Sequence, residues 1–160
     1  MSSVPTEAIR LVPGTSTDLA GVMTIMTAAF SPRFGEAWTR SQCAGILPMS
    51  GVSLMLARDR EGAQPAGFSL SRTIGGEAEL LLLAVDPGRQ ARGIGGLLLG
   101  LFLDRARAAG AARVHLEVRD GNSAIAMYRR AGFVPVGRRQ KYYRGDDGSQ
   151  YDAITLACEL

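Results

Sequence analysis

The stretch PGRQARGIGGLLLG, residues 87–100, is a loop rich in glycine and arginine that runs directly into an apolar helical pattern. Before it, residues 77–85 contain the run LLLLAV, which does not alternate and therefore predicts a strand buried on both faces. After it, the apolar residues recur at helical spacing, and they are Ile94, Leu97, Leu98, Leu101 and Phe102. The loop therefore lies at a helix start, where unpaired amide groups favour an anion.

Three kinds of phosphate-binding loop share features with this stretch. A P-loop requires lysine followed by serine or threonine, but Ile94 and Gly95 stand at those positions, which excludes it. The dinucleotide fingerprint G-x-G-x-x-G begins at Gly93, but Leu98 occupies its third glycine position. The pattern [RQ]-x-x-G-x-[GA] fits every position of residues 90–95, and an ordinary helix-start loop is the alternative.

Composition narrows the class of protein. The 160 residues are 46% hydrophobic and 21% charged, which is typical of one globular domain, expected to span residues 1–160. The formal net charge of +3 suits an anionic ligand but is too small to indicate nucleic-acid binding. Residues 1–14 lack a signal-peptide pattern, and no apolar run is long enough for a membrane span. Cys43 and Cys158 lack metal-ligand spacing, so we expect a cytoplasmic protein without a metal.

Hydrophobic periodicity and turn residues predict an α/β fold with a mixed, mostly antiparallel twisted sheet flanked by helices. The predicted strands cover residues 7–12, 52–59, 66–74, 77–85, 113–119, 133–143 and 151–160. The predicted helices cover residues 16–30, 38–47, 94–110 and 122–132. The strand at 113–119 alternates strictly, with His115, Glu117 and Arg119 on the face opposite its valines and leucine.

The hexapeptide and its surroundings resemble the GNAT superfamily of N-acetyltransferases, which bind acetyl-CoA. The resemblance is closest to the RimI family of ribosomal-protein alanine N-acetyltransferases, and it is carried by residues 83–99, HLEVR (115–119), AIAMYRRAGF (124–133) and residues 138–154. It covers residues 77–160, whereas the first half matches only in element order and in FGEAW, residues 34–38. The resemblance implies the GNAT fold, acetyl-CoA as co-substrate and no metal.

The resemblance also implies two catalytic residues. Glu117 would be the general base, acting through water, and Tyr128 would donate a proton to the departing sulfur. A phenol is a suitable acid for this step, because its ordinary pKa of about 10 lies close to that of a thiol, about 8.5. The alternatives are a surface carboxylate that pairs with His115 or Arg119, and a core tyrosine at helical spacing.

Cofactor contacts follow from the same resemblance. The pantetheine arm would pair with the backbone at the end of a strand, at Leu83, Ala84 and Val85. The residues that would hold the pyrophosphate are Gln90, Ala91, Arg92, Gly93, Ile94, Gly95 and Gly96. Asn122 matches an asparagine that contacts coenzyme A, but it lies six residues before Tyr128 where the family has seven. Asn122 is alternatively a helix N-cap.

The acceptor implied by the resemblance is a protein N-terminus, namely the N-terminal alanine of a small-subunit ribosomal protein. Such an amine has an ordinary pKa of about 7.7–8.0 and needs a weaker base than lysine, at about 10.4. The alternatives are a small-molecule amine, a lysine side chain, or a non-catalytic acyl-CoA sensor. Tyr142 and Tyr143 either shape a peptide groove or pack in a hairpin, and Glu79 is a possible site of attraction for an ammonium group. We expect a monomer or weak dimer, with no nucleic-acid or membrane partner.

Overall fold

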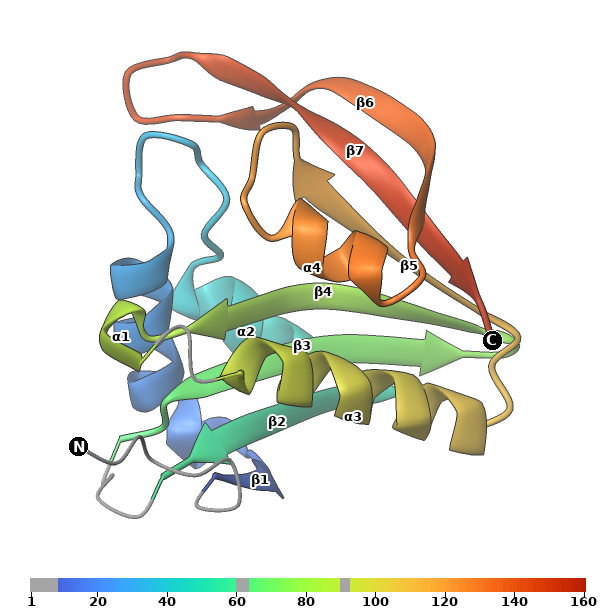
Figure 1. Cartoon of the computed structure of the whole chain (residues 1–160). Coiled ribbons are helices and arrows are strands. Elements are labelled where there is room, and N and C mark those ends of the chain that lie inside the picture. The colour runs from blue at the N-terminus through green and yellow to red at the C-terminus, as the bar shows by residue number, and fades with distance from the viewer. Residues whose placement is uncertain (1–8, 60–63, 90–92) are drawn as a thin grey trace, which may run out of the picture.

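The computed structural model describes residues 9–59, 64–89 and 93–160, which form a seven-stranded sheet with helices on both faces (Figure 1). The strands are β1 Arg10–Pro13, β2 Val52–Arg58, β3 Gly67–Ile74, β4 Glu77–Val85, β5 Arg113–Arg119, β6 Val134–Arg144 and β7 Gln150–Glu159. The α-helices are α1 Leu19–Ala29, α2 Arg40–Ile46, α3 Ile94–Ala108 and α4 Ile125–Arg130. Short 3-10 turns, Ser16–Asp18 and Pro87–Arg89, come before α1 and α3. The expected α/β fold with a mixed sheet is confirmed.

The strand order β1-β2-β3-β4-β5-β7-β6 contains one parallel pair among the described residues, β4 with β5. This parallel pairing runs only from Glu77 opposite Arg113 to Glu79 opposite His115. Further along, β4 continues to pair with β3 and β5 with β7. The two central strands therefore separate toward their carboxyl ends.

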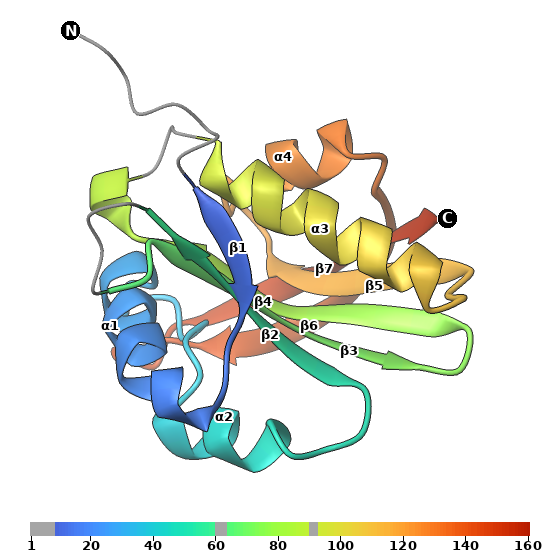
Figure 2. The same cartoon turned by 90° about the horizontal axis from the view of Figure 1, so that it is seen from below.

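Helices cover the two faces of the sheet in pairs (Figure 2). On one face, Phe102 of α3 and Tyr128 of α4 pack with Leu116 of β5 in one hydrophobic cluster. On the other face, Met26 of α1 packs with Phe68 of β3 in a second cluster, to which α2 also contributes. Since β4 contributes to both clusters, it is the strand about which the two layers are built.

The buried face of α3 differs from the predicted one. Leu97 and Leu101 were expected to face the core but are only partly buried. The buried residues of this helix are Ile94, Leu98, Leu99, Phe102, Leu103 and Ala106. The reason is that α3 packs against two clusters at once, with Leu98 in one and Leu99 in the other, which shifts the buried stripe.

Helices α2 and α4 begin later than predicted because of local side-chain hydrogen bonds. Thr39 forms a capping box with the residue three positions later, so α2 starts after it and Trp38 stays outside the helix. Before α4, Oδ1 of Asn122 accepts a hydrogen bond from the backbone amide of Ala124 at 2.8 Å. Residues 122–124, which were predicted to form the first turn of the helix, form this Asx turn instead, and α4 starts after them.

The remaining expectations concern the amino terminus, the thiols and membrane spans. The strand expected at residues 7–12 corresponds to β1, and residues 7 and 8 lie outside the described part of the chain. Cys43 is buried and Cys158 partly buried, and both are free thiols. Within the described ranges no helix has the length and apolarity needed to cross a bilayer.

Candidate active site

A cavity of about 690 Å³ opens where β4 and β5 separate. Its walls are the second half of β4, the first turn of α3, β5, the start of α4, the loop after α1 and the end of β6. In the cartoon, α3 and α4 lie on one face of the sheet and α1 on the other (Figure 2). The cavity is lined by residues from both faces, so it passes between the strands. Two reactants could therefore approach a common point from opposite faces.

The first turn of α3 forms one end of this cavity. Gly93 caps the helix with φ 76°, a left-handed conformation that glycine adopts without strain. A Cβ on Gly95 would lie 3.3 Å from Sδ of Met127 and 3.8 Å from side-chain carbons of Leu83 and Val85, so glycine keeps this space open. The helix amides that have no intrahelical partner, with the positive end of the helix dipole, suit a phosphate group.

The predicted cofactor residues that the structure describes all line this cavity. They are Leu83, Ala84, Val85, Gly93, Ile94, Gly95, Gly96 and Asn122. The side chain of Ile94 belongs to the core, with 1% exposed, so its backbone is what a ligand would meet. The remaining three, Gln90, Ala91 and Arg92, lie outside the described residues.

Glu117 lies on β5 with its side chain 13% exposed and lines the cavity. Oε1 accepts a hydrogen bond from Nε of Arg139 at 2.9 Å, and Oε2 accepts one from Oγ1 of Thr155 at 2.7 Å. The pairing with His115 or Arg119 considered above does not occur. The partners of Glu117 come from other strands of the sheet instead: Thr155 lies directly opposite on the neighbouring strand β7, and Arg139 reaches across from β6.

Tyr128 lies on α4, is 6% exposed, and lines the same cavity. Its ring packs edge-on against Phe133, with centroids 5.8 Å apart. Burial and, to a smaller extent, the charge of Glu36 raise the pKa of Tyr128 to about 12. The phenol therefore stays protonated well above pH 7. Tyr128 therefore packs in the hydrophobic core, as the alternative above proposed, and it also lines the cavity.

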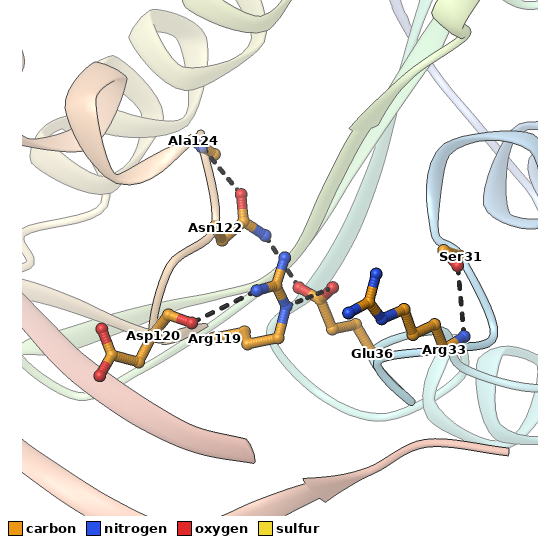
Figure 3. A network of polar contacts seen from close by, with 7 residues as sticks. All are labelled: Ser31, Arg33, Glu36, Arg119, Asp120, Asn122 and Ala124. Atoms are coloured by element: carbon orange, nitrogen blue, oxygen red, sulfur yellow. Dashed lines mark hydrogen bonds and ion pairs between the residues drawn. The ribbon is translucent and has the colours of Figure 1, made fainter. Parts of the chain in front are cut away.

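Asn122 contacts protein at both ends of its amide. Besides the Asx turn made by Oδ1, Nδ2 donates a hydrogen bond to Oε2 of Glu36 at 2.8 Å (Figure 3). The alternative that Asn122 is the N-cap of α4 is wrong, because Ala124 is the N-cap and Asn122 instead forms the Asx turn two positions before it. Its contact with coenzyme A stays a prediction.

Glu36, in the loop between α1 and α2, is a cavity-lining carboxylate that we did not predict as a site residue. Its side chain is 10% exposed, and Oε1 accepts a hydrogen bond from Nε of Arg119 at 3.0 Å (Figure 3). The guanidinium of Arg119 also stacks on Phe34, 3.7 Å from the ring centroid. The segment FGEAW contains Phe34 and Glu36, but no spacing or periodicity in it indicates these contacts.

Two tyrosines of β6, Tyr142 and Tyr143, also line the cavity. Tyr142 is 50% exposed, and its ring lies edge-on to that of Tyr143, with centroids 4.9 Å apart. Burial, followed by the charge of Glu36, raises the pKa of Tyr143. A register irregularity between Arg139 and Tyr143 interrupts the pairing of β6 with β7 at this point.

Glu79 is the third residue whose role was left open. It lines the cavity with 37% of its side chain exposed, and one carboxylate oxygen lies 3.6 Å from Nε2 of His115 on the neighbouring strand. His115 also approaches Glu77, at 4.0 Å from Nδ1. His115 therefore lies between two carboxylates of β4, Glu77 and Glu79.

Known proteins share both the sequence pattern and the fold. The profile of the acetyltransferase (GNAT) family matches residues 19–133. The [ribosomal protein bS18]-alanine N-acetyltransferase of Haemophilus influenzae is 37% identical over 100 residues, 62% of this chain and 68% of that protein. The mycothiol acetyltransferase of Clavibacter sepedonicus is 42% identical over 102 residues, which are 63% of this chain but 30% of that protein.

A solved structure extends the likeness to nearly the whole chain. The crystal structure of the ribosomal-protein-S18-alanine N-acetyltransferase from Escherichia coli superimposes with a TM-score of 0.84 and 29% sequence identity. The match covers 95% of this chain and 94% of that one. Family profile, relatives and fold agree: the chain belongs to the acetyltransferase (GNAT) family and is an N-acetyltransferase.

Proposed function

We propose that this protein transfers the acetyl group of acetyl-CoA to the N-terminal amine of a protein, the N-terminal alanine of a small-subunit ribosomal protein. One observation carries the proposal: a single cavity contains the glycine-lined start of α3 and the side chains of Glu117 and Tyr128. The relatives from Haemophilus influenzae and Escherichia coli, named for the alanine of a ribosomal protein, supply the acceptor. A ribosomal acceptor would place the reaction in the cytoplasm.

Acetyl-CoA fits the α3 end of the cavity. The amides of Gly93, Gly95 and Gly96 at the helix start suit its pyrophosphate, and the missing Cβ of Gly95 leaves room beside Leu83. Beyond Glu79 the edge of β4 that faces β5 has no strand pairing in the described residues, so peptide groups at Leu83 and Ala84 suit the amides of a pantetheine arm. Gln90, Ala91 and Arg92 would complete the seat, and Val85 and Ile94 border it.

Glu117 would accept the proton that the acceptor amine loses, through a water molecule. The nitrogen–carbon bond forms at the acetyl carbonyl as the carbon–sulfur bond breaks, and the sulfur takes a proton from the hydroxyl of Tyr128. A phenol is neutral at physiological pH, and the raised pKa of Tyr128 keeps it so, which is the form that a proton donor requires. Thr155 and Arg139 fix the orientation of the Glu117 carboxylate.

The acceptor would enter from the face of α1. The loop after α1, Tyr142 and Tyr143 line that end of the cavity, as expected of a groove for an extended peptide. Glu79 adds negative charge on the same side, which favours an amine that arrives as an ammonium group.

A small-molecule amine or a lysine side chain is the second candidate acceptor. The likeness to a mycothiol acetyltransferase favours the small molecule, because that relative is 42% identical over the aligned segment. The aligned segment is only 30% of that protein. A non-catalytic acyl-CoA sensor is disfavoured because a sensor would need neither Glu117 nor Tyr128 in its cavity.

A thiol-release assay separates these functions. One peptide would begin with a free alanine, and a matched peptide would have a blocked N-terminus and an internal lysine, beside a panel of small amines. The proposal expects turnover on the free N-terminus only. Turnover on the blocked peptide or on a small amine would assign the second candidate instead.

A further inference from the structure

Glu36 is a buried carboxylate for which the chemistry of acetyl transfer has no assigned use. Burying a charge is costly unless hydrogen bonds and an opposite charge compensate it. Both conditions hold, because Oε1 accepts from Arg119 and Oε2 accepts from Asn122. The side chain is only 10% exposed, yet it lines the cavity.

These two partners belong to the elements that carry the proposed catalytic residues. Arg119 follows Glu117 by two positions on β5 and so points to the same face of the sheet. Asn122 shapes the turn that leads into α4, the helix of Tyr128. Glu36 therefore joins the loop between α1 and α2 to both catalytic elements (Figure 3).

The same loop also packs tightly against the hairpin of β6 and β7. Gly35 has φ 69°, and a Cβ there would overlap the carbonyl oxygen of Arg144. The backbone amide of Asp146 donates a hydrogen bond to the carbonyl oxygen of Pro32 at 3.0 Å. The loop is thus an ordered wall of the cavity whose one carboxylate faces inward.

We propose that Glu36 is a positioning residue for the acceptor: it holds the α1–α2 loop as the acceptor wall and cancels the charge of Arg119 beside the path of the incoming ammonium group. This inference rests on the proposed function only for the identity of the acceptor. Without the Glu36 charge, the Arg119 guanidinium would repel an ammonium group. The loop would also lose the contacts that Glu36 makes with Arg119 and Asn122.

The charged and titratable groups that face Glu36 from other elements are Arg119 of β5, the phenol of Tyr128 on α4 and the phenol of Tyr143 on β6. The charge of Glu36 contributes to the raised pKa of both phenols. Arg33 of the same loop stacks on the Phe34 ring, 5.2 Å from its centroid. Arg119 is the cation that is hydrogen-bonded to the Glu36 carboxylate. Replacing Glu36 with a neutral residue therefore leaves the positive charge of Arg119 without a compensating negative charge.

The kinetic test uses Glu36→Gln, the double variant Glu36→Gln/Arg119→Gln, and Glu77→Gln as a matched control. Glu77 is a carboxylate 58% exposed that pairs with His115 and does not line the cavity. For Glu36→Gln we expect the peptide KM to rise about tenfold near pH 7 and less near pH 9, where the amine is neutral, with the acetyl-CoA KM within about twofold. In the double variant the peptide KM should return to within about threefold of the unmodified protein, because the uncompensated charge is gone.

An unchanged peptide KM in Glu36→Gln, or a double variant no better than the single one, would overturn the proposal. Hydrogen exchange tests the loop independently of any acceptor. Glu36→Gln should speed exchange of amides in residues 31–38 and 120–124, and Glu77→Gln should not. If no peptide is acetylated by the unmodified protein, the proposed acceptor is wrong, and unchanged exchange in Glu36→Gln would then overturn the positioning role by itself.

Discussion

Thr155 donates a hydrogen bond from Oγ1 to Oε2 of Glu117 at 2.7 Å, and the two residues face each other across β7 and β5. This contact fixes the carboxylate from within the sheet. Thr155→Val keeps the side-chain shape but removes the donor, so Glu117 loses its orientation toward the cavity. We expect kcat/KM to fall about tenfold, the effect of roughly 1.4 kcal/mol on the barrier. Thr155→Ser retains the hydroxyl and should keep most of the activity, whereas equal losses in both variants would speak against an orienting role.

Arg139 contacts the other oxygen of Glu117, but from the surface, with 63% of its side chain exposed. Exposed ion pairs contribute about 0–1 kcal/mol because water and salt screen them. Arg139→Gln should therefore reduce kcat/KM less than Thr155→Val does, in steady-state assays of both variants at one ionic strength. A larger loss in Arg139→Gln would mean that the guanidinium acts on the substrate directly.

Tyr128 should titrate far above an ordinary phenol. Burial raises its pKa from 10.0 to about 12, and unfolding returns it to the ordinary value. The neutral phenol's contribution to the free energy of unfolding is therefore complete below pH 10 and is lost as the pH rises to 12, by roughly 2–3 kcal/mol. The ultraviolet titration of the folded protein minus that of Tyr128→Phe measures this directly. A difference transition near pH 10 would contradict the burial of the hydroxyl.

Gly95→Ala should weaken acetyl-CoA binding. The added Cβ would lie 3.3 Å from Sδ of Met127 and reduce the space beside Leu83 at the start of α3. Gly100→Ala is the matched control, because a Cβ there meets no atom within 4 Å in the middle of the same helix. Calorimetric titration should show a Kd at least about tenfold higher for Gly95→Ala and unchanged for Gly100→Ala. Equal affinities would place the cofactor elsewhere.

The buried face of α3 gives a prediction of stability. Leu98 is fully buried, with 0% exposed, so Leu98→Ala should lower the free energy of unfolding by about 2–5 kcal/mol. Leu97 was predicted to face the core but is only partly buried, so Leu97→Ala should lower the free energy of unfolding by less than Leu98→Ala does. Urea unfolding of the two variants compares them, and a larger loss for the Leu97 variant would contradict the observed buried face of α3.

The glycine-lined start of α3 was predictable because its signals are local. Gly93 and Gly95 stand next to the strand end and helix start that they connect, and their backbone requirement is visible in six consecutive residues. The alternation of β5 likewise determines which face Glu117 occupies. These features depend only on residues that are close together in the sequence, so a local pattern is enough to predict them.

The wall of the cavity that contains Glu36 and Glu117 was not predictable in the same way. Glu36 meets Arg119 and Asn122, which are 83 and 86 positions away, through a loop with no hydrophobic period. Thr155 reaches Glu117 only because β7 inserts between β5 and β6 in a given register. Such pairings depend on strand register and loop packing, which no short pattern specifies.

The most direct measurement is acetyl-CoA-dependent thiol release with an alanine-initiated peptide, compared among the unmodified protein, Glu117→Gln and Tyr128→Phe. The account predicts turnover for the unmodified protein and losses of about 10²–10⁴-fold in kcat for each variant, with acetyl-CoA binding retained. Full activity in both variants, or acetyl-CoA binding with no transfer to any free N-terminus, would contradict it.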